Sequence, residues 1–195
     1  MRVSIRIYLI ASIAFWLGVL PGIAEIVSTP AAPPSATVPA PPTAIAPEDY
    51  VLAPSTVAFV QTTGKWDDAE ALLDTAFKSI YAALARQNIH ATGVPMVEYL
   101  DSDDSTFSFK AMVPITAAAG INLAPDVGIG EGPSGKVLKF VHHGSFDDLE
   151  QVYNRIDDYL AAKGLSMQRV VEEYATDQAV TPPDNMVTNI YVFAE

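Results

Sequence analysis

The sequence of 195 residues contains no cysteine and few basic residues. Without cysteine the chain has no disulfide, no thiolate metal ligand and no cysteine nucleophile. It has 11 Lys and Arg against 23 Asp and Glu, a formal net charge of −12 at pH 7. This excess of acid argues against a nucleic-acid partner, whose phosphates are bound by Lys and Arg, and gives little attraction to anionic lipid. The hydrophobic fraction of 50% is too high for an intrinsically disordered chain.

Motifs that carry catalysis or hold cofactors are also lacking. The sequence has no phosphate-binding P-loop, no Gly-x-Ser-x-Gly elbow and no His-Glu-x-x-His pair. His142 and His143 are adjacent, and neighbouring side chains on a strand point in opposite directions, so they do not share a metal ion. We therefore expect no catalytic set, no metal site and no cofactor.

Residues 1–24 predict a secretory signal peptide. Arg2 and Arg6 precede the apolar stretch 7–20, which is followed by small residues up to Ala24. A positive start, a short apolar region and a small-residue end are typical of a leader cleaved after that alanine. The alternative is an uncleaved anchor, because the apolar stretch approaches the minimum length of a membrane-spanning helix. Both alternatives place the folded part outside the cytoplasm, so we expect a periplasmic or secreted protein that meets a membrane only through an uncleaved leader.

Residues 25–50 predict a Pro/Ala-rich linker. Prolines recur from Pro30 to Pro47 among Ala, Ser, Thr and Val, a composition that favours extended polyproline II over a helix or a sheet interior. The segment is interpreted as a spacer; the alternative is a ligand for an aromatic groove, which the absence of flanking basic residues disfavours. Residues 51–195 have regular apolar periodicity and predict one folding domain.

The folding domain contains a duplicated unit, about 55–116 and about 136–195. Each copy has a strand ending in Phe-Val, a polar turn with glycine, an aromatic-Asp-Asp triplet, a helical apolar pattern, a short strand with Glu-Tyr and a closing strand that alternates. The strand ends and triplets are Phe59-Val60 and Phe140-Val141, and Trp66-Asp67-Asp68 and Phe146-Asp147-Asp148.

These patterns predict an α+β fold in which two β-α-β-β units form one curved antiparallel sheet with two long helices. Each acidic pair stands at a helix start, where carboxylates cap free N–H groups and face the positive end of the helix dipole. The first helix is expected to be one turn longer than the second, and Gly164 to end the second as a left-handed cap. The segment 117–135, rich in Ala, Gly and Pro, is expected to be a loop.

The second unit carries a family resemblance. Its quoted parts are the run KFVHHGSFDDLEQVYNRIDDYLAAKGL, then Glu172-Glu173-Tyr174, Thr181-Pro182-Pro183 and the closing strand VTNIYVF. In this order they resemble the GyrI-like, AraC-type bacterial effector-binding domain family, and the first unit, ending in Val113-Pro114-Ile115, matches more loosely. Over about residues 55–195 the resemblance implies two pseudo-symmetric βαββ units with a small organic effector bound in the cleft between them.

Six residues are candidates for lining that cleft. Alternation places polar and aromatic residues of the two closing strands on one face, opposite an apolar face that meets the helices. The closing strands supply four of the candidates, namely Lys110, Met112, Asn189 and Tyr191. Tyr99 and Tyr174, at equivalent positions in the two units, are suited to stack on a ligand and orient it. The alternatives are that the two tyrosines belong to the core and that Lys110 and Asn189 face solvent. We expect a preformed cleft of about 300–1,000 Å³.

The resemblance also bears on the ligand and on function. Cation-binding members carry a glutamate where Asn189 stands, and Lys110 would repel a cation, so we expect a neutral or anionic ligand. The leading hypothesis is an exported small-molecule binding protein. Members of the family also regulate transcription, inhibit gyrase or hydrolyse small strained electrophiles, and export disfavours the first two roles. The remaining alternatives are a hydrolase using Glu98 or Glu173 beside a tyrosine, and an envelope interaction module with an exposed apolar patch.

Overall fold

The computed structural model describes residues 46–116, 123–177 and 180–195. The predicted leader and most of the predicted linker lie outside the described residues. Within the described ranges, no helix combines the length and the apolar character that a membrane crossing requires.

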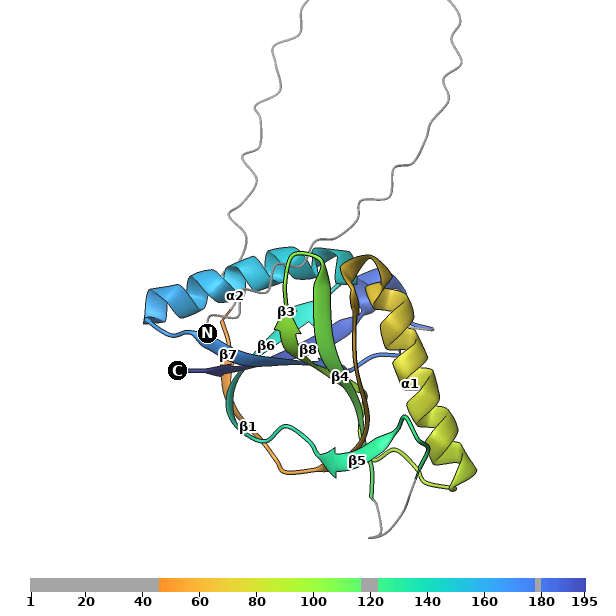
Figure 1. Ribbon diagram of the computed structural model, residues 1–195. Helices are drawn as coiled ribbons and strands as arrows, with labels where there is room; N and C mark the ends of the chain where they lie inside the picture. Colours follow the sequence, from red (N-terminus) through yellow and green to blue (C-terminus); the bar gives the residue numbers. More distant parts are fainter. Residues whose placement is uncertain (1–45, 117–122, 178–179) are drawn as a thin grey trace, which may run out of the picture. The chain divides into compact units, whose positions relative to one another are not determined.

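The described residues form one eight-stranded antiparallel sheet with two long helices, which confirms the predicted α+β fold (Figure 1). The strands are β1 (Glu48–Leu52), β2 (Thr56–Lys65), β3 (Met96–Ser102), β4 (Thr106–Pro114), β5 (Gly128–Glu131), β6 (Gly135–His143), β7 (Met167–Tyr174) and β8 (Val187–Ala194). The helices are α1 (Ala69–Arg86) and α2 (Leu149–Lys163), with short 3₁₀ turns at Trp66–Asp68, Phe146–Asp148 and Pro183–Asn185. The strand order is β1-β6-β8-β7-β3-β4-β2-β5.

Two of these strands, β1 and β5, were not predicted. β1 begins at Glu48, inside the predicted linker, and β5 lies in the segment 117–135 that was expected to be a loop. β1 precedes β2 of the first unit but pairs with β6 of the second unit. β5 precedes β6 of the second unit but pairs with β2 of the first. The glycines that concealed β5 have a packing reason. A Cβ atom at Gly128 would lie 2.6 Å from the ring of Phe59, so only glycine lets these strands approach.

The strand registers show that the two halves are equivalent. The halves meet where β3 pairs with β7, and there Glu98 lies opposite Val171 while Met96 lies opposite Glu173. On the outer side of these strands, Lys110 of β4 pairs with Glu98 and Asn189 of β8 pairs with Glu173. Lys110 and Asn189 therefore occupy equivalent positions, as the repeat alignment predicted.

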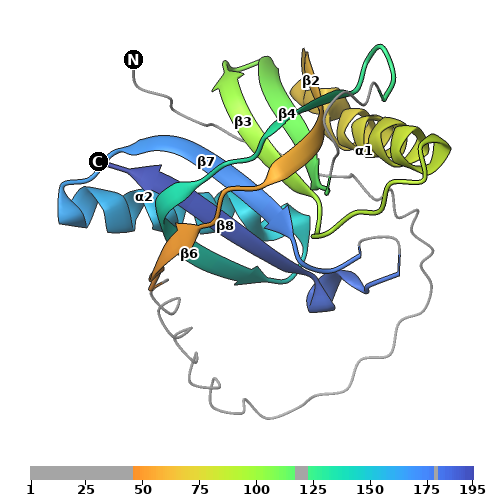
Figure 2. The ribbon, with the colours of Figure 1, turned by 90° about the horizontal axis from the view of Figure 1, so that it is seen from below.

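Both helices cover one face of the sheet, and the outer strands β1 and β5 curl away on the other side (Figures 1 and 2). Under α1 the core is centred on Ile80, Phe107 and Phe109, and under α2 it is centred on Phe140 and Ile156. All five side chains are at most 1% exposed. Side chains alternate between the two faces of the sheet along each strand. Each strand therefore has one set of side chains that faces the helices and one set that faces the concave side.

The helix ends differ in part from the prediction. The acidic pairs lie in 3₁₀ turns that precede the helices, and the side chains of Asp68 and Asp148 make no capping hydrogen bond. The second turn is capped instead by Ser145, whose hydroxyl accepts from the Asp147 N–H. Gly164 does end α2 in the left-handed conformation, with φ of 69°. Helix α1 has 18 residues against 15 in α2, close to the expected extra turn.

The hairpin from β3 to β4 is closed by Asp103. Its carboxylate accepts hydrogen bonds from the backbone N–H groups of Ser105 and Thr106 at 2.8 and 2.7 Å, and from the Thr106 hydroxyl at 3.0 Å. These donors lower the pKa of Asp103 to about 2. The carbonyl oxygen of the same residue accepts from the indole N–H of Trp66 at 2.9 Å. The turn is thus held to the start of α1, which positions the strands that bear Glu98 and Lys110.

Candidate functional site

The middle of the concave face is filled by the protein's own side chains. A buried apolar cluster lies there, and we call it the concave cluster. Its members are Val57, Met96, Met112, Val137, Val171 and Tyr191, with Leu52, Phe59 and Phe193 partly buried against them. The segments that lead from β1 to β2 and from β5 to β6 meet across this face, where the N–H of Gly132 donates to the carbonyl of Ser55 at 2.8 Å. The cluster thus occupies the place where the sequence predicted an open cleft of about 300–1,000 Å³.

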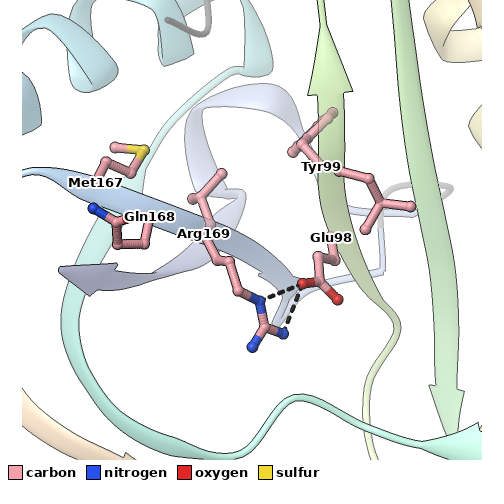
Figure 3. A pocket seen from close by; sticks show the side chains of 7 residues that line it. Glu98, Tyr99, Met167, Gln168 and Arg169 are labelled. Carbon is pink, nitrogen blue, oxygen red and sulfur yellow. Dashed lines mark hydrogen bonds and ion pairs between the residues drawn. The ribbon is translucent and has the colours of Figure 1, made fainter. Parts of the chain in front are cut away.

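A smaller pocket, of about 160 Å³, opens where β3 and β7 separate. The ladder between these strands ends at Tyr99 and Val170. Beyond that point each strand has a bulge against its outer neighbour, between Tyr99 and Asp101 in β3 and between Met167 and Arg169 in β7. Bulges bend strands and interrupt their pairing, so the two strands diverge here. The pocket is lined by Glu98, Tyr99, Leu100, Met167, Gln168, Arg169 and Val170 (Figure 3).

An ion pair between Glu98 and Arg169 forms the polar part of this pocket. Nε of Arg169 donates to Oε1 of Glu98 at 2.7 Å, and Nη2 lies 2.7 Å from the same oxygen (Figure 3). The Glu98 side chain is 10% exposed and the Arg169 side chain 47% exposed. The guanidinium lies over the ring of Phe193, 4.5 Å from its centroid. The ion pair is therefore anchored on the concave cluster on one side and open to solvent on the other.

The equivalent carboxylate in the second half, Glu173, has neutral partners. It accepts hydrogen bonds from the Asn189 amide at 2.6 Å and from the Tyr191 hydroxyl at 2.9 Å. Burial and the hydrogen bond to Glu173 both raise the pKa of Tyr191, so the hydroxyl stays a donor. Its ring stacks on Tyr50 of β1 at 5.7 Å. Two of the predicted site residues, Asn189 and Tyr191, are thus brought together by Glu173.

Lys110 and Met112 lie on the same concave face as Asn189 and Tyr191. Met112 is 0% exposed within the concave cluster, so it is closed to solvent. The Lys110 ammonium lies 4.4 Å from the centroid of the Phe59 ring and donates to the carbonyl oxygen of Glu131 at 3.4 Å. The lysine therefore extends toward β2 and β5.

The side chains of Tyr99 and Tyr174 lie on the helix face and not on the concave face with Lys110, Met112, Asn189 and Tyr191. Both hydroxyls donate to Glu172, at 3.3 Å from Tyr99 and 3.0 Å from Tyr174, and a third donor, the Tyr153 hydroxyl of α2, lies at 2.7 Å. Tyr174 is 5% exposed in the core, which agrees with the alternative reading of a core tyrosine. Tyr99 also borders the pocket from its helix side.

The carboxylate that gathers these hydroxyls is itself buried. Glu172 is 1% exposed. Burial raises its pKa, while the three tyrosine hydroxyls and the nearby His142 lower it in part. Nε2 of His142 lies 2.9 Å from the carbonyl oxygen of Ser145. This contact links the end of β6 to the turn before α2. Among the described residues, no group of three or more His, Asp or Glu side chains could hold a metal ion.

Arg169 and Glu172 are the residues that the sequence reasoning missed. A signal for the arginine was present, since alternation puts Arg169 on the same face of β7 as Val171 and Glu173. The same alternation puts Glu172 with Tyr174 on the opposite face. Applied to β7 as it was to the closing strands, the rule would have found both residues.

The fold recurs among solved structures at low sequence identity. The EcmrR C-terminal domain has a TM-score of 0.66 at 11% identity, covering 77% of this chain and 98% of that domain. SAV2435 bound to tetraphenylphosphonium has a TM-score of 0.57 at 13% identity, covering 77% and 94%. A hydrolase from Listeria innocua has a TM-score of 0.56 at 14% identity, covering 76% and 91%. These TM-scores show a shared fold, and at such low identities the likeness extends to the fold alone.

Comparisons of sequence are more specific. No curated protein matches the chain. The model of the GyrI-like small molecule binding domain matches residues 51–193. That match covers both halves of the sheet and both helices, from within β1 to within β8. The chain therefore belongs to the GyrI-like small molecule binding domain family.

Proposed function

We propose that the protein is an exported binding protein for a small neutral or anionic organic molecule, which it binds on the concave face at the pocket between β3 and β7. The observation that carries this proposal is the state of the two carboxylates on that face. Glu98 is paired with Arg169, and Glu173 accepts from Asn189 and Tyr191. A cation would have to displace these partners, and each displaced group would lose a charge-assisted hydrogen bond.

The basic groups on the same face support this preference. The Arg169 side chain is about half exposed and lines the pocket, and Lys110, which lies on the same face of the sheet in β4, extends toward β2 and β5. A guanidinium presents several N–H donors in one plane, a geometry suited to carboxylate and carbonyl oxygens. A neutral or anionic group entering the pocket therefore meets a guanidinium that has N–H groups beyond the two directed at Glu98.

Export rests on the sequence of residues 1–24. The positive start, the apolar stretch and the small residues before Ala24 support a cleaved leader. We accordingly propose that the binding domain works in the periplasm or outside the cell.

A thermal-shift screen of the full chain tests the ligand preference. The library contains neutral, anionic and cationic compounds, with tetraphenylphosphonium as a cationic probe. A compound present at 100 times its dissociation constant stabilises the fold by ~2.7 kcal/mol. We expect the compounds that raise the melting temperature to be neutral or anionic and small. Stabilisation by organic cations alone, or by no compound in the library, would overturn the proposal.

A further inference from the structure

The pocket between β3 and β7 is lined by a hydrogen-bond donor and an acceptor that are paired with each other, Arg169 and Glu98. Both Nε and Nη2 of Arg169 are directed at one oxygen of Glu98, Oε1. Among the described residues, no group donates to the second oxygen, Oε2. The remaining N–H groups of the guanidinium likewise meet no protein acceptor in the described part of the chain. One acceptor and several donors are therefore available to a bound molecule.

The charges of these two groups cancel within the pocket. A carboxylate ligand would be attracted by Arg169 and repelled by Glu98, whose side chain is only 10% exposed. An amidinium or ammonium ligand would be attracted by Glu98 and repelled by Arg169. Because a partly buried carboxylate and guanidinium interact strongly at this distance, a charged ligand would have to separate the pair. A neutral group with a carbonyl oxygen and an N–H beside it satisfies both partners without separating them.

The walls and the size of the pocket restrict the rest of the ligand. Leu100 and Met167 supply apolar surface to the pocket, and Tyr99 and Val170 border it from the helix side of the sheet. The volume of about 160 Å³ is smaller than the ~300–1,000 Å³ of sites for drug-sized molecules. The pocket thus fits one planar polar group with a ring or a short apolar chain attached.

We propose that this pocket recognises a primary carboxamide, a lactam or a cyclic imide, whose carbonyl accepts from Arg169 and whose N–H on the same edge donates to Glu98. The inference rests on the proposed function and narrows it, within neutral and anionic ligands, to neutral amides. Specificity arises because a ligand that lacks the donor or the acceptor leaves a desolvated polar group without a partner.

Three probes of one shape test this proposal: benzamide, benzoate and benzamidinium. Each is titrated into the full chain while the backbone amide resonances of Leu100 and Gln168 are followed by NMR. For the unmodified protein we expect benzamide to bind at least about tenfold more tightly than either ion, the effect of about one net hydrogen bond.

Two variants change the charge of the pocket and shift the order of the probes. Glu98→Gln leaves the Arg169 charge uncompensated, so benzoate is expected to become the best ligand. Arg169→Met leaves the Glu98 charge uncompensated, so benzamidinium is expected to become the best ligand. Arg86→Met and Glu150→Gln, at exposed positions of α1 and α2, change the net charge by the same amounts and should leave the order unchanged. Since the two pocket variants remove different partners, either one that folds provides the test.

The outcomes separate this inference from the proposed function. Equal affinity of the three probes, or an order that the pocket variants leave unchanged, overturns the amide assignment while binding at the pocket stands. Absence of any shift at Leu100 and Gln168 with all three probes overturns the amide assignment as well. If, in addition, no compound of the thermal-shift library stabilises the protein, the proposed function fails with it.

Discussion

Replacing Glu172 with leucine is expected to destabilise the fold by about 4 kcal/mol, because three buried tyrosine hydroxyls lose their acceptor at once. Tyr99 comes from the first half of the sheet, Tyr174 from the second, and Tyr153 from α2. Their common acceptor in β7 lies opposite Val97 of β3, at the junction of the halves. Glu172 thus ties both halves and one helix to a single carboxylate. Chemical denaturation of the full chain measures the loss.

Two further variants separate the hydrogen bonds from side-chain size and from charge. Glu172→Gln keeps an acceptor oxygen and is expected to lose only about 1–2 kcal/mol. Glu150→Leu, on the exposed side of α2, removes the same charge and should change stability by no more than about 0.5 kcal/mol. If Glu172→Leu unfolds at nearly the same denaturant concentration as the unmodified protein, the tyrosine hydroxyls do not depend on this acceptor.

The pH dependence of the same variant follows from the pKa of Glu172. Burial raises the pKa of this carboxyl in the folded state, so the folded protein binds the proton more tightly than the unfolded chain does. Stability from this group is therefore fully present below its unfolded pKa and is lost as pH rises through the raised folded pKa. The difference in stability between the unmodified protein and Glu172→Leu should accordingly decrease from acidic toward neutral pH.

Truncating Met112 to alanine is expected to cost about 3 kcal/mol and to open a cavity under the concave face. Met112 is 0% exposed and lies in register between Phe59 of β2 and Met96 of β3. Its removal leaves an apolar space lined by the concave cluster, and apolar cavities of this kind bind small apolar molecules. We therefore expect benzene to raise the melting temperature of Met112→Ala but not that of the unmodified protein.

A methionine outside the concave cluster supplies the control. Met186 is half-buried in the turn before β8, and Met186→Ala should lose less stability and gain nothing from benzene. Stabilisation of the unmodified protein by benzene to the same extent as Met112→Ala would mean that the concave face already contains an open apolar space. That result would contradict the packing described for this face.

The fold followed from the sequence because the repeated elements have strong periodic patterns. Phe107 and Phe109 alternate with Ser108 and Lys110 along β4, and the structure buries both phenylalanines against α1. The short strands β1 and β5 have no such pattern. β5 is the run Gly-Ile-Gly-Glu, in which the ring of Phe59 requires a glycine at position 128, and that contact joins strands far apart in the sequence.

The repeat alignment was correct for the closing strands but one residue off at the first strands. The Phe-Val pairs suggested that Phe59 corresponds to Phe140. In the structure Val60 pairs with Ala111 and Phe140 pairs with Ile190, so Phe140 corresponds to Val60. A two-residue match cannot set the register, because a shift by one residue moves every side chain to the other face of the sheet.

The candidate site was predictable only in part, for a related reason. Alternation correctly put Lys110, Met112, Asn189 and Tyr191 on one face, since that requires only the period of the strand. Whether the concave face is open depends on how far β1 and β5 curl and on the volume of the side chains that meet there. Neither quantity can be obtained from the period of a strand, so the filled centre and the pocket at Glu98 emerge only from the structure.

The most direct test of ligand binding at the β3–β7 pocket is an NMR map of the full chain with the compound that raises its melting temperature most. We predict that the backbone amide signals of Glu98, Leu100, Gln168 and Arg169 move during the titration, and that those around Glu172 stay in place. Shifts confined to the helix face, or spread over the outer surface with none at the pocket, would contradict it.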